Sequence, residues 1–129
     1  MENISVPVSP GEVLDKITIL EIKSERIEDE AKLVNVRKEL ELLSDTWCHF
    51  ITEDEAIQSL KARLKEVNET LWEIEDDIRD KERAHEFDQE FIRLARAVYV
   101  TNDKRSEIKK ELNLHLGSQI VEEKSYQAY

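Results

Sequence analysis

The stretch DQEFIRLARAVYVTNDKRSEIKKELNLHLG, residues 88–117, decides the fold because it has the pattern of one long helix. Asp88 is placed to cap its first turn and Gly117 to close its last. Residues 97–103 have poor helix propensity, but the apolar spacing keeps its phase across them. We therefore expect one unbroken helix. The apolar residues, at steps typical of one helical face, are Phe91, Leu94, Ala95, Val98, Ile108, Leu112 and Leu116.

A polar gap interrupts this face at Asn102 and Arg105, where the spacing calls for apolar residues. A buried arginine without a partner is costly, so Arg105 needs a carboxylate, a ligand or solvent beside it. One interpretation is a structural polar layer, with Glu75 or Glu21 as the partner of Arg105. The other is a cleft that binds an anionic or sugar-like ligand. The candidate lining residues are Asn102, Arg105, Lys109, Tyr99, Glu75, Arg79, Lys16 and Glu21.

Capping signals predict the start of two further helices. Ser9 followed by Pro10 and Glu12 predicts the first helix, and Thr52 with Glu55 predicts the third. The third helix has the most regular alternation of three- and four-residue steps in the chain. It suits a partner helix within the fold or across a dimer, and we expect a homodimer through this seam. Its apolar residues are Ile57, Leu60, Leu64, Val67, Leu71, Ile74 and Ile78.

The apolar pattern changes phase near residues 28–30, between the first helical face and the next. Residues 10–51 therefore form either a helical hairpin or one bent helix. The change of phase favours the hairpin, although no glycine or proline marks a turn. The first face comprises Val13, Ile17, Leu20, Ser24 and Ile27, and the second comprises Leu33, Val36, Leu40, Leu43 and Trp47.

The two ends of the chain lack helical periodicity. Residues 4–8 alternate between apolar and polar side chains, and residues 119–126 contain two adjacent β-branched residues. We expect these segments to pair as a small β-ribbon lying against the helices. The predicted fold is thus all-α: a single helical domain, residues 1–129, formed by three or four long antiparallel helices with a two-stranded ribbon at the termini.

Composition limits the classes of partner. The chain has 38% charged residues, two glycines, two prolines and a net charge of −11. This composition is typical of long helices with short connections. The negative charge argues against nucleic acid or an anionic membrane surface as partner. No apolar run could span a bilayer, the N-terminus lacks a signal-peptide pattern, and the single cysteine, Cys48, fits a reducing compartment. We expect a cytoplasmic protein without membrane insertion.

Acidic residues suggest one enzymatic alternative. Glu73 and Asp76 form an ExxD run, a pattern used by small all-helical nucleotide pyrophosphohydrolases. The EExxE run of those enzymes is absent, and Glu21 and Glu25 are the nearest substitutes. The alternative function is therefore a Mg²⁺-dependent hydrolase of nucleotide or sugar-nucleotide diphosphates. The chain shows no zinc-site spacing, phosphate-binding glycine loop or nucleophile signature, so no other cofactor is expected.

Four segments carry a resemblance that covers almost the whole chain. They are Pro7–Lys23, Leu71–Asp76, Val98–Asp103 and Glu122–Tyr126. With these segments the chain resembles an uncharacterised family of small bacterial and phage proteins, a domain of unknown function. Members of that family accompany glycosyltransferase and surface-polysaccharide functions, which implies a sugar or sugar-phosphate context but no catalytic residues. Our leading hypothesis is a non-enzymatic binding or scaffold module with a polar cleft.

Overall fold

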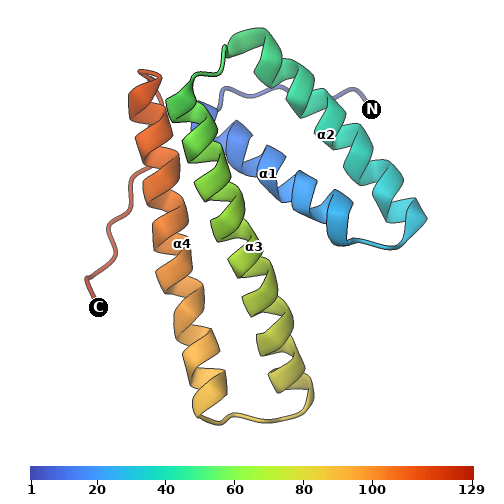
Figure 1. Cartoon of the computed structure of the whole chain (residues 1–129), viewed down its shortest axis with the longest axis vertical. Helices are drawn as coiled ribbons and strands as arrows, with labels where there is room; N and C mark the ends of the chain where they lie inside the picture. The colour runs from blue at the N-terminus through green and yellow to red at the C-terminus, as the bar shows by residue number, and fades with distance from the viewer.

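The protein is all-helical and contains no β-strand (Figure 1). A computed structural model describes residues 1–129. None of its helices has both the length and the apolar character that crossing a membrane would require. The helices are α1 (Pro10–Arg26), α2 (Glu30–Phe50), α3 (Glu55–Arg83) and α4 (Gln89–His115).

Capping residues set the helix ends largely as their chemistry predicts. The Ser9 hydroxyl accepts from the Glu12 amide at 3.3 Å, and the Asp88 carboxylate accepts from the Phe91 amide at 3.0 Å. Gly117 closes α4 with a φ of +65°, so the predicted long helix is confirmed. The predicted start of α3 is wrong, since Asp54 caps it in place of Thr52.

The helices form two hairpins of unequal length. In Figure 1, α3 and α4 run side by side as a long antiparallel pair, and α1 and α2 cover only its upper half. A three-residue connection, residues 27–29, joins α1 to α2, which settles the choice between a hairpin and a bent helix. At backbone level α1 contacts all three other helices, whereas α2 contacts only α1. The centre of the fold is therefore α1 rather than the long α4.

The main apolar core lies where all four helices meet. α1 is buried more widely than a single face predicts, because it packs between α2 on one side and α3 and α4 on the other. The seam of α3 packs inside the chain against α1 and α4. The core residues are Leu14, Ile17, Trp47, Ile57, Leu60, Leu64, Ile108 and Leu112.

Gly11 allows the first turn of α1 to approach α4 closely. A Cβ atom at this position would lie 2.8 Å from the Lys109 carbonyl oxygen and 2.9 Å from Asn113 Oδ1. The Gly11 amide donates to Asn113 Oδ1 at 2.7 Å, and Asn113 is 1% exposed. A glycine is required here by the space between two helices, not by its backbone angles. This contact fixes α1 against the last turns of α4.

The predicted terminal β-ribbon is wrong. Residues 4–8 run past α2, whereas residues 118–129, here called the C-terminal segment, turn back along α4 (Figure 1). Pro7 has no amide hydrogen to donate to a ladder. Side-chain bonds to α4, described below, hold the C-terminal segment instead of backbone pairing. The two ends of the chain therefore lie apart.

Candidate functional site

A buried polar layer joins α1, α3 and α4 beside the apolar core. The Asp15 carboxylate, only 4% exposed, accepts from Arg105 Nε at 2.9 Å and also from Arg105 Nη2. The side-chain amide of Asn68 donates to Asp15 Oδ1 at 2.9 Å and to the Thr18 hydroxyl at 3.0 Å. No buried side-chain nitrogen or oxygen in the protein lacks a hydrogen-bond partner. The layer is therefore closed, with its charges satisfied internally.

The partner of Arg105 is Asp15, and the predicted partners Glu75 and Glu21 are wrong. Asp15 lies outside the single apolar face expected for the first helix, yet α1 is buried on more than that face. The fork of the guanidinium matches the carboxylate with two parallel bonds, which fixes orientation as well as charge. Hydrogen bonding to Asp15 raises the pKa of Arg105, although partial burial opposes this shift. The structure thus places Arg105 in a structural layer.

A second group of charges lies where α1, α4 and the C-terminal segment meet. Lys109, 9% exposed, pairs with Glu12 of α1 and with Glu122 at 3.1 Å, while Lys110 pairs with Glu123 at 3.3 Å. Burial lowers the pKa of Lys109, but its bonds to the two glutamates outweigh burial and raise it. The same contact lowers the pKa of Glu122. These ion pairs hold the C-terminal segment on α4.

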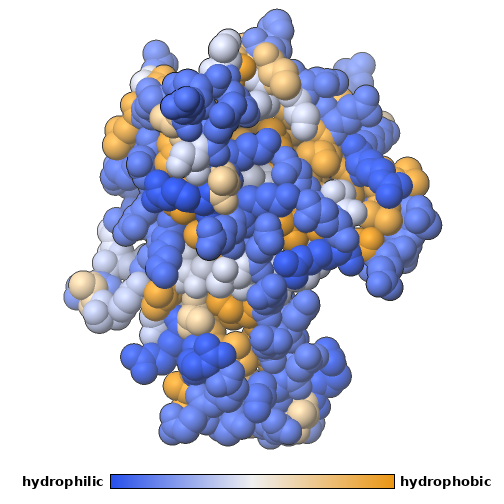
Figure 2. Space-filling view, in the orientation of Figure 1, coloured by the Kyte–Doolittle hydropathy of each residue, from blue (hydrophilic) through white to orange (hydrophobic).

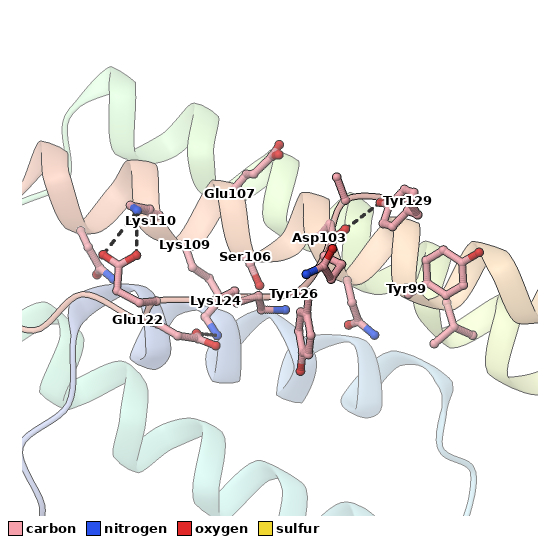
Figure 3. A pocket seen from close by; sticks show the side chains of 16 residues that line it. Tyr99, Asp103, Ser106, Glu107, Lys109, Lys110, Glu122, Lys124, Tyr126 and Tyr129 are labelled. Carbon is pink, nitrogen blue, oxygen red and sulfur yellow. Dashed lines mark hydrogen bonds and ion pairs between the residues drawn. The ribbon is translucent and has the colours of Figure 1, made fainter.

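The C-terminal segment and α4 enclose a groove of about 900 Å³ (Figure 3). All three tyrosines of the chain line it. The rings of Tyr99 and Tyr129 lie 5.0 Å apart, and the Tyr129 hydroxyl donates to Asp103 at 2.6 Å. That bond raises the pKa of Tyr129. The other lining residues are Val98, Asn102, Ser106, Glu107, Lys109, Lys110, Asn113, Glu122, Glu123, Lys124, Tyr126, Gln127 and Ala128.

The groove has two chemically different ends. Figure 3 shows Lys110 and Glu122 toward one end and Tyr99 with Tyr129 toward the other. Three lysines and four carboxylates line the groove, so the opposite charges nearly cancel. Amide and hydroxyl groups from Asn102, Ser106 and Gln127 add neutral hydrogen-bonding groups. The groove therefore offers an aromatic surface, neutral polar groups and balanced charges to a ligand.

Only three of the eight predicted cleft residues line the groove. Tyr99, Asn102 and Lys109 line the groove, and Arg105 turns to Asp15. The remaining four lie elsewhere, so the prediction that all eight meet in one cleft is wrong. Each forms an ion pair on a helix surface: Glu75 with Arg79 on α3, Lys16 with Glu39 of α2, and Glu21 with Lys61 and Lys65 of α3.

The acidic residues of the enzymatic alternative do not form a metal site. Glu73 pairs with Arg26 at 3.5 Å, and Asp76 is exposed. Glu21 and Glu25 both pair with Lys65. No three side chains of histidine, cysteine, aspartate or glutamate lie close enough together to hold a metal ion. The structure therefore gives the pyrophosphohydrolase alternative no support.

Sequence reasoning missed the part that the C-terminal segment plays in the groove. The segment has no helical or strand periodicity. The side chains that it contacts belong to residues much earlier in the sequence. One signal was present in the sequence. The adjacent pair Lys109-Lys110 is complementary in charge to the adjacent pair Glu122-Glu123, and the two pairs make matching contacts. Matching short charge pairs could thus have located the segment.

The protein is thus a small, acidic, helical protein whose C-terminal segment forms one wall of a groove. A search of curated proteins and a search of solved structures find no match to it. A family model matches residues 4–129, so the chain belongs to DUF6165, a family of unknown function. The matched region includes the C-terminal segment, so both walls of the groove lie within the family domain.

Proposed function

We propose that this protein is a non-enzymatic binding module that holds a sugar-like ligand in the groove between α4 and the C-terminal segment. The observation that carries the proposal is the gathering of all three tyrosines in this groove. An aromatic face packs well against the apolar C–H face of a sugar ring, and a few polar groups fix its orientation. Asn102, Ser106 and Gln127 supply such groups.

Charge supports a sugar-like ligand over a polyanion. The lysines of the groove are balanced by carboxylates, and the chain as a whole carries a net charge of −11. A polyanion would be repelled by this field. The surface-polysaccharide context that the family resemblance implies agrees with a sugar-like ligand.

Binding without catalysis is favoured by the state of the groove's carboxylates. Three of the four are already bonded, Asp103 to Tyr129 and the two glutamates of the C-terminal segment to the lysines of α4. A general acid or base must reach the proton that it transfers, and these groups are engaged with the protein instead. We therefore assign the groove to recognition.

Calorimetric titration with neutral hexoses and N-acetylhexosamines tests the proposal. We expect saturable binding by the natural chain and its loss in Tyr99→Ala, because the substitution removes the stacking surface. Phe50→Ala is the matched control, since Phe50 is an exposed aromatic residue at the end of α2, outside the groove. Binding that survives Tyr99→Ala, or no binding by any sugar of the panel, would contradict the proposal.

We also propose that two copies associate through the lower part of α3. The upper seam is buried inside the chain, but Leu71 and Ile78 remain half-buried below it. Figure 2 shows hydrophobic atoms at the surface over the lower parts of α3 and α4. Sedimentation equilibrium should give twice the mass of the chain, whereas a monomer at every concentration would exclude the dimer.

A further inference from the structure

The C-terminal segment is attached to α4 almost entirely by side chains. Its last backbone hydrogen bond to α4 runs from the Ser118 amide to the Asn113 carbonyl. Beyond that point three polar contacts hold it, from Glu122, Glu123 and Tyr129. The three side chains belong to exposed residues, and the exposed pair of Lys110 with Glu123 stabilises the contact only weakly. Lys109 is buried, but it keeps its ion pair with Glu12 when Glu122 leaves. The segment can therefore be displaced without disturbing a helix.

Glu122 and Glu123 pair their carboxylates with Lys109 and Lys110 at the charged end of the groove. Glu122 contacts the ammonium of Lys109, which keeps a second carboxylate, Glu12, when the segment leaves. Lys110 is half-exposed and has only Glu123 as partner. An ammonium group has three donor hydrogens, so both lysines can bond an acidic group of a ligand in place of the segment.

From these contacts we propose that the lysine pair Lys109-Lys110 is an anion subsite, and that Glu122 and Glu123 occupy it as an internal competitor. The ligand of the groove is then a sugar with one acidic group, a phosphate or a carboxylate, whose binding displaces Glu122 and Glu123 from the lysines while Tyr129 keeps its bond to Asp103 and the tyrosines stay in the groove. This inference rests on the proposed function, because the sugar ring is held by the tyrosines. It adds the chemical class of the ligand and a movement that accompanies binding.

Lys124 gives the movement a direct readout. It is the last lysine or arginine of the chain, so trypsin cleavage after it releases residues 125–129 as one peptide. We expect glucose 1-phosphate or glucuronate to accelerate this cleavage in the natural chain, and glucose to leave its rate unchanged. A cleavage rate that no acidic sugar changes would overturn the displacement of the segment.

The double variant Glu122→Gln with Glu123→Gln tests the competition itself. Its segment should be cleaved rapidly without ligand, and its affinity for the acidic sugars should rise about threefold or more, since fewer molecules are blocked. The matched control is Glu28→Gln with Glu41→Gln, which changes the net charge equally at two exposed glutamates that form no ion pair. Unchanged affinity in the groove variant, or an equal rise in the control, would overturn the inference.

Neutral and acidic sugars separate this inference from the proposed function. Binding of glucose with no gain from an acidic group would reject the anion subsite and leave the sugar groove in place. Binding of inorganic phosphate alone, with no sugar bound, would reject the sugar groove. Tighter binding of acidic than of neutral sugars, reinforced in the double glutamine variant, supports both.

Discussion

The two polar regions of α4, the layer around Arg105 and the charged end of the groove around Lys109, differ in the partners of their charged side chains. Arg105 faces α1, where a buried carboxylate from a helix meets it with two bonds. Lys109, one turn further along, is shared between a helix and the exposed C-terminal segment. A partner on a packed helix cannot leave without unfolding, whereas a partner on the segment can. Neighbouring polar residues on one helix thus divide into a structural layer and the groove that we propose as a ligand site.

Arg105→Ala should have the largest effect on stability. It leaves the Asp15 carboxylate buried without its cation, which costs about 3–5 kcal/mol for a broken buried pair. Urea unfolding followed by circular dichroism measures the change. Lys104→Ala is the control, because this exposed neighbour has no ion-pair partner and should change stability by less than about 0.5 kcal/mol. A small loss for Arg105→Ala would mean that Asp15 finds solvent and that the layer is open.

Gly11→Ala should be the next most damaging substitution. Alanine favours a helix over glycine by up to about 1 kcal/mol. The added Cβ would meet the backbone carbonyl of Lys109 at 2.8 Å, however, and overpacking of this kind costs about 1–3 kcal/mol. We expect a net loss in thermal unfolding. Gly117→Asn is the control, because asparagine tolerates the left-handed conformation and nothing lies near that position. A stabilised Gly11→Ala variant would contradict the close packing of α1 on α4.

The substitution Asn102→Ala should distinguish the groove from the structural layer most clearly. Asn102 and Arg105 belong to the same polar gap, yet only Asn102 lines the groove. Its loss should weaken sugar binding by about three- to tenfold, the worth of one hydrogen bond, and leave the unfolding free energy almost unchanged. Calorimetry and urea unfolding of the same sample give both quantities. Lower stability with unchanged binding would move Asn102 into the structural layer.

Acid should release the C-terminal segment, the smallest of the expected effects. Contact with Lys109 lowers the pKa of Glu122 below its ordinary value of 4.5, so the contact is fully stabilising above that value. Its contribution is lost as the pH falls through the lowered pKa of the folded state. The signals of Tyr126 and Tyr129 should then sharpen in NMR spectra while the helical circular dichroism persists. Glu122→Gln should remove this dependence, and a segment that stays ordered in acid would contradict it.

Local chemistry predicted much of the fold. Caps and apolar spacing are sufficient to predict α4 as one long helix. Ser9 caps the start of α1 and Gly117 closes α4, as their residue types indicate. The start of α3 was misplaced because both Thr52 and Asp54 can cap a helix. Asp54 caps α3 in the structure, and the two residues before it form a connection in which Glu53 accepts from the Trp47 indole at 3.0 Å.

Contacts between distant residues limited the prediction of the site. Asp15 lies 90 positions from Arg105, and only the packing of α1 between its neighbours brings them together. Lys109 and Tyr99 were identified as candidates, but the other wall of their groove is an irregular segment without periodicity. The sequence therefore predicts a ribbon at residues 119–126, whereas the structure has a wall of the groove there.

The most direct test of the sugar groove uses the tyrosines themselves. Replacing tyrosine with 3-fluorotyrosine gives three ¹⁹F signals, all from the groove, and 5-fluorotryptophan gives two controls, Trp47 and Trp72, outside it. We expect an acidic sugar to shift all three tyrosine signals in a saturable way and to leave both tryptophan signals in place. Unmoved tyrosine signals, or equal shifts in the tryptophans, would contradict a ligand site between α4 and the C-terminal segment.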